Sequence, residues 1–105
     1  MYDMAKLESL SALGQGATKA MSAFRVFDKA ALGDGVVPKK YKELIALAVA
    51  LTTQCPYCLE LHRAAAEAAG ATPAEVAETA MVAAARRAGA AITHAVHLVD
   101  NHCEE

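Results

Sequence analysis

Alanine fills roughly a quarter of the 105 positions, and this abundance of the strongest helix former constrains the fold more than any other feature. Patterns that favour strands are nearly absent. We therefore predict one all-α domain over residues 1–105, with about five helices joined by short connections. Hydrophobic residues make up 55% of the chain but aromatic residues only 5%. So much apolar sequence on so few large side chains indicates that part of the apolar surface meets other subunits.

Glycine and proline residues divide the chain into helical pieces. Apolar residues recur at helical spacing up to residue 32, with a break expected at Gly14 and Gly16. Pro38 suits the first turn of a second helix, and residues 72–75 (TPAE) have the form of a capping box. The predicted helices cover residues 4–32, 38–53, 55–70, 72–87 and 90–100.

The helix predicted over residues 38–53 is apolar all round from Leu44 onward. This pattern favours burial on every side and a central position in the assembly. Three lysines, Lys39, Lys40 and Lys42, lie at the start of the same helix and are expected to form its solvated end.

Charge and composition exclude several classes of function. The net charge of −2 argues against a nucleic-acid-binding surface or a basic membrane-binding patch on this protein. The longest apolar run, residues 44–51, is too short to cross a bilayer, and the first ten residues lack the features of a signal peptide. A cytoplasmic location is therefore expected. In a reducing compartment, three cysteines favour a metal site or redox chemistry over a structural disulfide framework.

Two of these cysteines form the sequence Cys55-Pro56-Tyr57-Cys58, and His62 follows four residues later. In a helix, Cys55, Cys58 and His62 would lie on one face across the first two turns. The first turn of a helix exposes unpaired N–H groups and the positive end of the helix dipole, which favour a thiolate. We expect both the helix N-terminus and His62, one turn further along, to lower the pKa of Cys58.

Glu43 is the one acidic residue between Asp34 and Glu60. Along one continuous helix it would lie about 18 Å from Cys55, too far to interact. If the chain reverses near residues 52–54 into an antiparallel hairpin, Glu43 stands opposite His62. This arrangement predicts a relay in which a carboxylate orients an imidazole that takes a proton from a thiol.

The run from Glu43 to Val76, ELIALAVALTTQCPYCLELHRAAAEAAGATPAEV, resembles the carboxymuconolactone decarboxylase superfamily. Within it, the sequence is similar to the alkyl hydroperoxide reductase D-like (AhpD-like) branch, whose pattern is a glutamate, a Cys-x-x-Cys pair and then a histidine. The similarity extends from about residue 24 to residue 75. One departure lies at Tyr57, where the best-studied AhpD-like proteins carry a second histidine, although many shorter members of the family share the tyrosine.

The resemblance implies a helical fold assembled as a homo-trimer or homo-hexamer. It also implies a thiol-disulfide oxidoreductase with peroxidase activity and no bound cofactor, acting on a peroxide or disulfide and reduced by an external dithiol or redox protein. Carried over to this chain, Cys58 is the attacking thiol, Cys55 the resolving thiol, and Glu43 and His62 the proton relay.

Two other functions remain open at the level of sequence. Cys55, Cys58 and His62 could supply three zinc ligands in a binding protein without redox turnover, although a fourth ligand is missing nearby. Alternatively, Glu43 and His62 could carry out acid-base chemistry without the thiols, as the decarboxylase resemblance implies.

The remaining candidate residues have weaker signals. Tyr57 is interpreted as packing or lining the site entrance, with a possible hydrogen bond to substrate. The last part of the chain carries Cys103, interpreted as an incidental exposed thiol, and three histidines interpreted as helix surface or subunit contacts: His94, His97 and His102.

Overall fold

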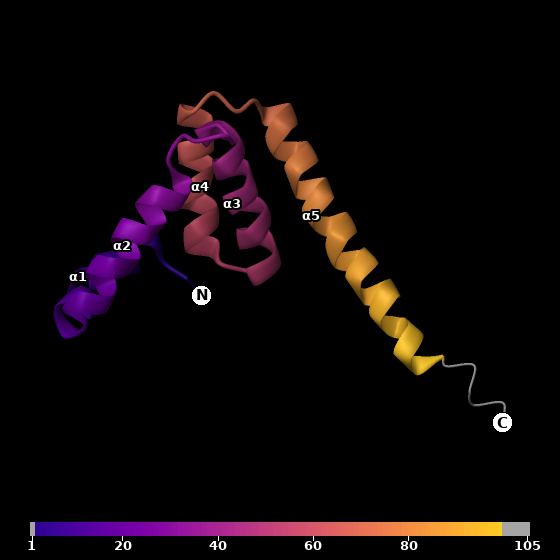
Figure 1. Ribbon diagram of the computed structural model, residues 1–105, viewed down its shortest axis with the longest axis horizontal. Coiled ribbons are helices and arrows are strands. Elements are labelled where there is room, and N and C mark those ends of the chain that lie inside the picture. Colours follow the sequence, from indigo (N-terminus) through magenta and orange to yellow (C-terminus); the bar gives the residue numbers. More distant parts are fainter. Residues whose placement is uncertain (1, 100–105) are drawn as a thin grey trace.

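The computed structural model describes residues 2–99, which form five α-helices and two short 3-10 helices (Figure 1). In chain order the elements are η1 (Met4–Ser9), α1 (Leu10–Gly16), α2 (Thr18–Leu32), α3 (Lys39–Thr53), α4 (Pro56–Ala68), α5 (Pro73–His94) and η2 (Ala95–Leu98). The predicted all-α class is confirmed, and the described residues contain no strand. The expected break in the first region lies at Ala17, between α1 and α2.

An antiparallel hairpin of α3 and α4 forms the centre of the molecule (Figure 1). The chain reverses at Gln54, which adopts a left-handed conformation with φ of 58° and ends α3. Cys55 then caps α4, and Pro56 occupies the first turn, where a missing N–H is tolerated. The predicted reversal and the predicted start of the cysteine-bearing helix are therefore confirmed.

The core is small and lies where α3 crosses α4. Leu44 and Leu47 of α3 pack with Ala66 of α4, which is fully buried. Alanine at position 66 lets the two helices approach closely because its side chain ends at Cβ. Partly buried residues close the edges of this core: Leu59, Ala71 and Val76.

α5 begins with the predicted capping box. Thr72 Oγ1 accepts the Glu75 N–H at 3.1 Å, and Glu75 Oε1 accepts the Thr72 N–H at 2.9 Å. The prediction that this helix ends before Gly89 is wrong, because α5 continues to His94. Its neighbours are good helix formers, and one glycine lowers helix stability by only about 1 kcal/mol. The separate helix predicted over residues 90–100 is therefore the end of α5 followed by η2; residue 100 lies outside the described part.

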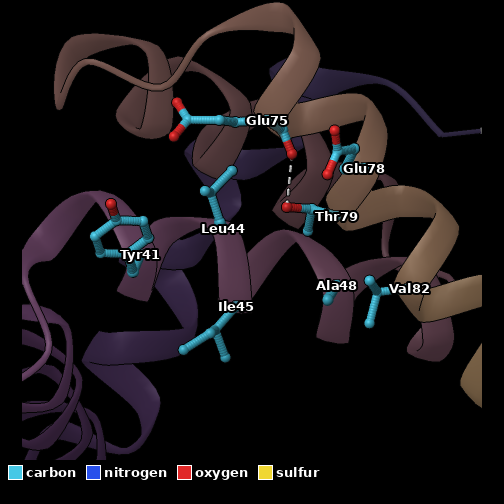
Figure 2. Close-up of a pocket in the computed structure, with 8 residues that line it drawn as sticks. All are labelled: Tyr41, Leu44, Ile45, Ala48, Glu75, Glu78, Thr79 and Val82. Carbon is cyan, nitrogen blue, oxygen red and sulfur yellow. Dashed lines mark hydrogen bonds between the residues drawn. The ribbon is translucent and has the colours of Figure 1, made fainter.

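α3 is not buried on every side within one chain, contrary to expectation. Its buried residues lie on the side that faces α4 and α5, whereas Ile45 is 56% exposed. Ile45 lies in an apolar groove of about 410 Å³ between α3 and α5 (Figure 2). The other residues that line the groove are Tyr41, Leu44, Ala48, Glu75, Glu78, Thr79 and Val82. No helix in the described part is both long and apolar enough to span a membrane.

The closeness of the α3–α4 crossing can be tested at Ala66. We expect Ala66→Leu to lower the free energy of unfolding by about 1–3 kcal/mol, because the larger side chain has no space between the helices. Ala64→Leu, at an exposed position of the same helix, should change it by less than about 0.5 kcal/mol. Urea unfolding of both variants measures the difference, and equal values would contradict the tight crossing.

Candidate active site

The two cysteines of α4 contact each other at the start of the helix. Cys55 is the N-cap residue, and its sulfur accepts the backbone N–H of Cys58 at 3.3 Å. The two sulfurs are 2.6 Å apart, and both thiols are free and half-buried. The N-cap position and the single turn between the residues therefore bring the thiols into direct contact.

The two thiols differ in acidity, and the difference is opposite to the expected one. The hydrogen bond from the Cys58 thiol, helped by the Cys58 backbone N–H, lowers the pKa of Cys55. The same thiol hydrogen bond, together with burial and the negative charges of Cys55 and Asp28, raises the pKa of Cys58 to about 11. Cys58 is therefore not the more acidic thiol in the dithiol state. The sequence indicated the favourable helix terminus but not which sulfur would accept its N–H.

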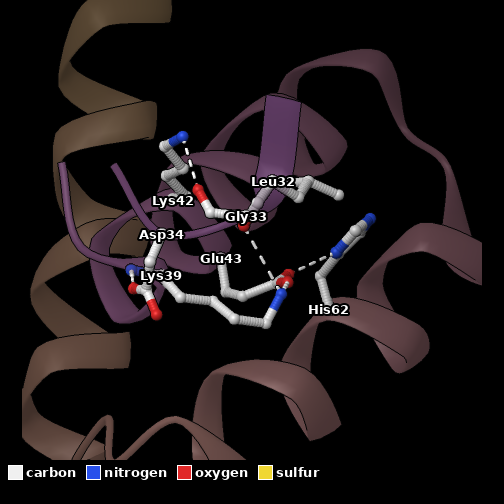
Figure 3. Close-up of polar contacts among 7 residues, drawn as sticks. All are labelled: Leu32, Gly33, Asp34, Lys39, Lys42, Glu43 and His62. Atoms are coloured by element: carbon white, nitrogen blue, oxygen red, sulfur yellow. Dashed lines mark hydrogen bonds and ion pairs between the residues drawn. The ribbon is translucent and has the colours of Figure 1, made fainter. Parts of the chain in front are cut away.

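Glu43 of α3 and His62 of α4 face each other across the hairpin, as the predicted reversal requires (Figure 3). Glu43 Oε1 lies 2.6 Å from His62 Nδ1, and the Glu43 side chain is only 3% exposed. An ionised carboxylate can only accept hydrogen bonds, so Nδ1 carries the hydrogen and Nε2 is the basic nitrogen. Figure 3 shows the second ring nitrogen on the side of the imidazole away from Glu43.

Lys39 is a third member of this cluster that sequence reasoning missed. Its Nζ lies 2.9 Å from Oε2 of Glu43, the carboxylate oxygen that His62 does not use (Figure 3). The spacing of four residues between Lys39 and Glu43 was the available signal. The expected solvated lysine end is confirmed for Lys39, which is exposed, whereas Lys40 and Lys42 are partly buried. Lys40 binds Glu75 at 3.0 Å, and Lys42 donates to the Gly33 carbonyl at 2.6 Å.

The charge of Glu43 follows from these contacts. Burial by itself would raise the pKa of this carboxyl group, because water no longer solvates the anion. The hydrogen bonds from Lys39 and His62 outweigh burial, so the pKa of Glu43 is lowered from its usual 4.5. Glu43 is therefore ionised at neutral pH.

The thiol pair lies next to the carboxylate–imidazole pair along α4, but no direct contact joins the two pairs. His62 follows Cys58 by about one helical turn. Among residues 2–99, no hydrogen bond links the imidazole to either thiol. A proton that passes between the two pairs must therefore move through a substrate, a water molecule or a change of rotamer.

The structure also places the weaker candidates. The Tyr57 ring packs edge-on against Tyr2, with ring centroids 5.5 Å apart, while its contact with substrate stays a prediction. The rings of His94 in α5 and His97 in η2 make an edge-on contact, with centroids 5.2 Å apart, and Cys103 and His102 lie outside the described residues. Within residues 2–99, no three histidine, cysteine or acidic side chains come together as a metal site would require.

Comparison with known proteins gives the family. The family model described as carboxymuconolactone decarboxylase matches residues 11–101, which is most of the chain. The chain belongs to this family. The predicted family and its helical fold are thus confirmed, and the AhpD-like branch is consistent with the match.

Two relatives and one solved structure cover much of the chain. A Paracoccus denitrificans protein described as uncharacterized protein 4 in cox locus is 42% identical over 90% of this chain and 88% of its own length. An uncharacterized protein of Cupriavidus necator is 45% identical over 64% of this chain and 59% of its own length. The crystal structure of an apo carboxymuconolactone decarboxylase family protein from Legionella pneumophila has 35% identity and a TM-score of 0.69. It covers 73% of this chain and 69% of that protein.

The order of thiol ionisation can be tested by alkylation. We expect iodoacetamide to modify Cys55 before Cys58, because the thiolate forms first at Cys55. In Cys55→Ser, the pKa of Cys58 should fall below about 11, since the neighbouring thiolate is gone. Mass spectrometry over a pH series measures both residues, and faster modification of Cys58 in the wild type would contradict this order.

Proposed function

We propose that this protein is a cytoplasmic thiol-disulfide oxidoreductase with peroxidase activity of the AhpD type. The observation that carries the proposal is the contact of two free thiols at 2.6 Å beside a buried carboxylate–imidazole pair on the same hairpin. Two adjacent thiols can be oxidised to a disulfide without a large movement of the backbone, and the imidazole offers a base near them. No organic cofactor is needed for this chemistry.

The two thiols supply both electrons that reduce the peroxide. One thiolate attacks an oxygen of a hydroperoxide, the O–O bond breaks, and the leaving alkoxide takes up a proton to become an alcohol. The sulfenic acid that forms is attacked by the second thiol, which releases water and closes the disulfide between Cys55 and Cys58. The thiols lose two electrons and the peroxide gains them. An external dithiol then reduces the disulfide by exchange and becomes a disulfide itself.

The family resemblance assigns the attack to Cys58, whereas the order of ionisation favours Cys55. For Cys58 to attack, its proton must first leave for another base, and His62 Nε2 is the basic nitrogen on the same helix. For Cys55 to attack, the thiolate is already stabilised by the Cys58 N–H. Single-cysteine variants separate the two routes, because the attacking residue alone can form a stable sulfenic acid.

One observation favours acid-base catalysis without the thiols as a second function. The pair of Glu43 and His62 is complete by itself, with a 2.6 Å contact that involves neither sulfur. Such an activity would survive replacement of both cysteines, which the peroxidase would not.

We further propose that the protein self-associates. The chain exposes 8045 Å², whereas a compact monomer of this mass exposes roughly 5,600 Å². Its radius of gyration is 18.3 Å, against roughly 13 Å for a compact domain of this length. The excess of roughly 2,400 Å² is of the size that a permanent interface buries. We therefore expect a second copy of this chain to bury the apolar groove and the exposed side chains of Phe24 and Phe27 in α2.

Turnover should require both cysteines. We expect Cys55→Ser and Cys58→Ser each to lose dithiol-dependent peroxide consumption by at least about a hundredfold, because the disulfide can no longer close. Tyr2→Phe, which keeps the aromatic contact with Tyr57, is the control. Peroxide consumption with a dithiol donor measures the effect. Full activity in a variant without cysteines would replace this proposal by the acid-base one, and tightly bound stoichiometric zinc would replace it by a binding role.

Self-association should depend on the apolar groove. We expect the mass in solution to be a multiple of 10.9 kDa, with a value that distinguishes the trimer from the hexamer. The substitutions Ile45→Glu and Val82→Glu should shift the protein toward the monomer, because these side chains are 56% and 61% exposed in one chain and would be charged in the interface. Glu67→Gln, on the exposed face of α4, should leave the mass unchanged. Light scattering after gel filtration measures it, and a monomeric wild type would contradict the proposal.

A further inference from the structure

The buried carboxylate of Glu43 has one partner for each oxygen. Oε1 contacts His62 Nδ1 at 2.6 Å, and Oε2 contacts Lys39 Nζ at 2.9 Å (Figure 3). The carboxylate is 97% covered, whereas the Lys39 side chain is 46% exposed and the His62 side chain 24%. The carboxylate is thus buried, while both of its partners, Lys39 and His62, are partly exposed to solvent.

Lys39 also contacts the end of α2 and the loop before α3. Its backbone N–H donates to Asp34 Oδ1 at 2.7 Å, which caps the start of the helix. Its Nζ also lies 3.5 Å from the carbonyl oxygen of Leu32. These contacts fix the backbone of Lys39 and give its Nζ a second acceptor beside Glu43.

We propose that Lys39 is a positioning residue that keeps Glu43 charged and oriented while His62 gains and loses a proton. This inference rests on the proposed function, because it concerns the base of the same site. If His62 were the sole partner, each loss of its proton would leave a buried carboxylate without a cation, which is unfavourable. With Lys39 present, the negative charge stays paired in both protonation states of the imidazole. His62 can therefore act as a base without release of Glu43.

The charged groups around Glu43 agree with this role. On α3 the nearest cation is Lys39, since Lys42 is bound to the Gly33 carbonyl. From α4 the facing group is His62, and from the preceding loop it is Asp34, which binds the backbone of Lys39. Lys39 is therefore the cation of the cluster that takes no part in the proposed proton transfer.

The test replaces the lysine and follows Glu43 directly. In Lys39→Gln, the carboxyl ¹³C signal of Glu43 should titrate at a higher pH than in the wild type, because one of the two groups that lower its pKa is lost. Lys39→Arg should restore the wild-type midpoint. Lys40→Gln is the matched control, because it removes the same charge one residue away, from a lysine bound to Glu75.

The acid limb of peroxide turnover should move upward in Lys39→Gln, because the loss of a nearby cation favours the protonated base, and return in Lys39→Arg. An unchanged midpoint in Lys39→Gln would overturn the role of Lys39, whatever the turnover. A raised midpoint with an unmoved acid limb would equally overturn it, since Lys39 would then hold Glu43 without serving the base. Absence of turnover in the wild type would overturn the proposed function, while the carbon titration would still decide whether Lys39 keeps Glu43 charged.

Discussion

The buried Glu43 carboxylate is the interaction on which the α3–α4 hairpin depends. A charge removed from water must be paired, and its partners come from both helices: Lys39 from α3 and His62 from α4. A shift of α4 by one residue would rotate His62 away from Glu43 and leave the anion with one partner. The apolar contact between Leu47 and Ala66 holds the helices together, and the ion pair selects their register. One hairpin thereby serves both packing and chemistry.

The sequence predicted where α4 and α5 begin because the signals for a helix start are local. Thr72 and Glu75 have the spacing of a capping box, and Pro56 follows the cysteine that caps α4. The contact of Glu43 with His62 followed from one further step, since a reversal midway between them sets the two opposite each other. Local chemistry and chain counting together were therefore sufficient to place the two halves of the site.

What the sequence did not predict depends on three-dimensional detail. The acidity of the thiols is decided by which sulfur accepts the Cys58 N–H and by the nearby charge of Asp28 on α2, neither of which spacing reveals. Gly89 was interpreted as a helix end, but the alanines around it outweigh one glycine. Ile45 belongs to an apolar run but is exposed in one chain. An apolar pattern thus predicts burial but does not identify the surface that would bury it. Packing between distant segments decides each of these points.

The division of the site into two pairs has a mechanistic consequence. The two thiols are hydrogen-bonded to each other, and Glu43 is hydrogen-bonded to His62, so the polar groups of each pair are satisfied without the other pair. A substrate oxygen placed between Cys58 and His62 Nε2 would join the pairs, because it could accept a proton from one and an electron pair from the other. The same geometry limits idle loss of the thiol proton, since the base has no direct hydrogen bond to either sulfur in the described structure. Reactivity at such a site would rise when a substrate is bound, as catalysis by proximity requires.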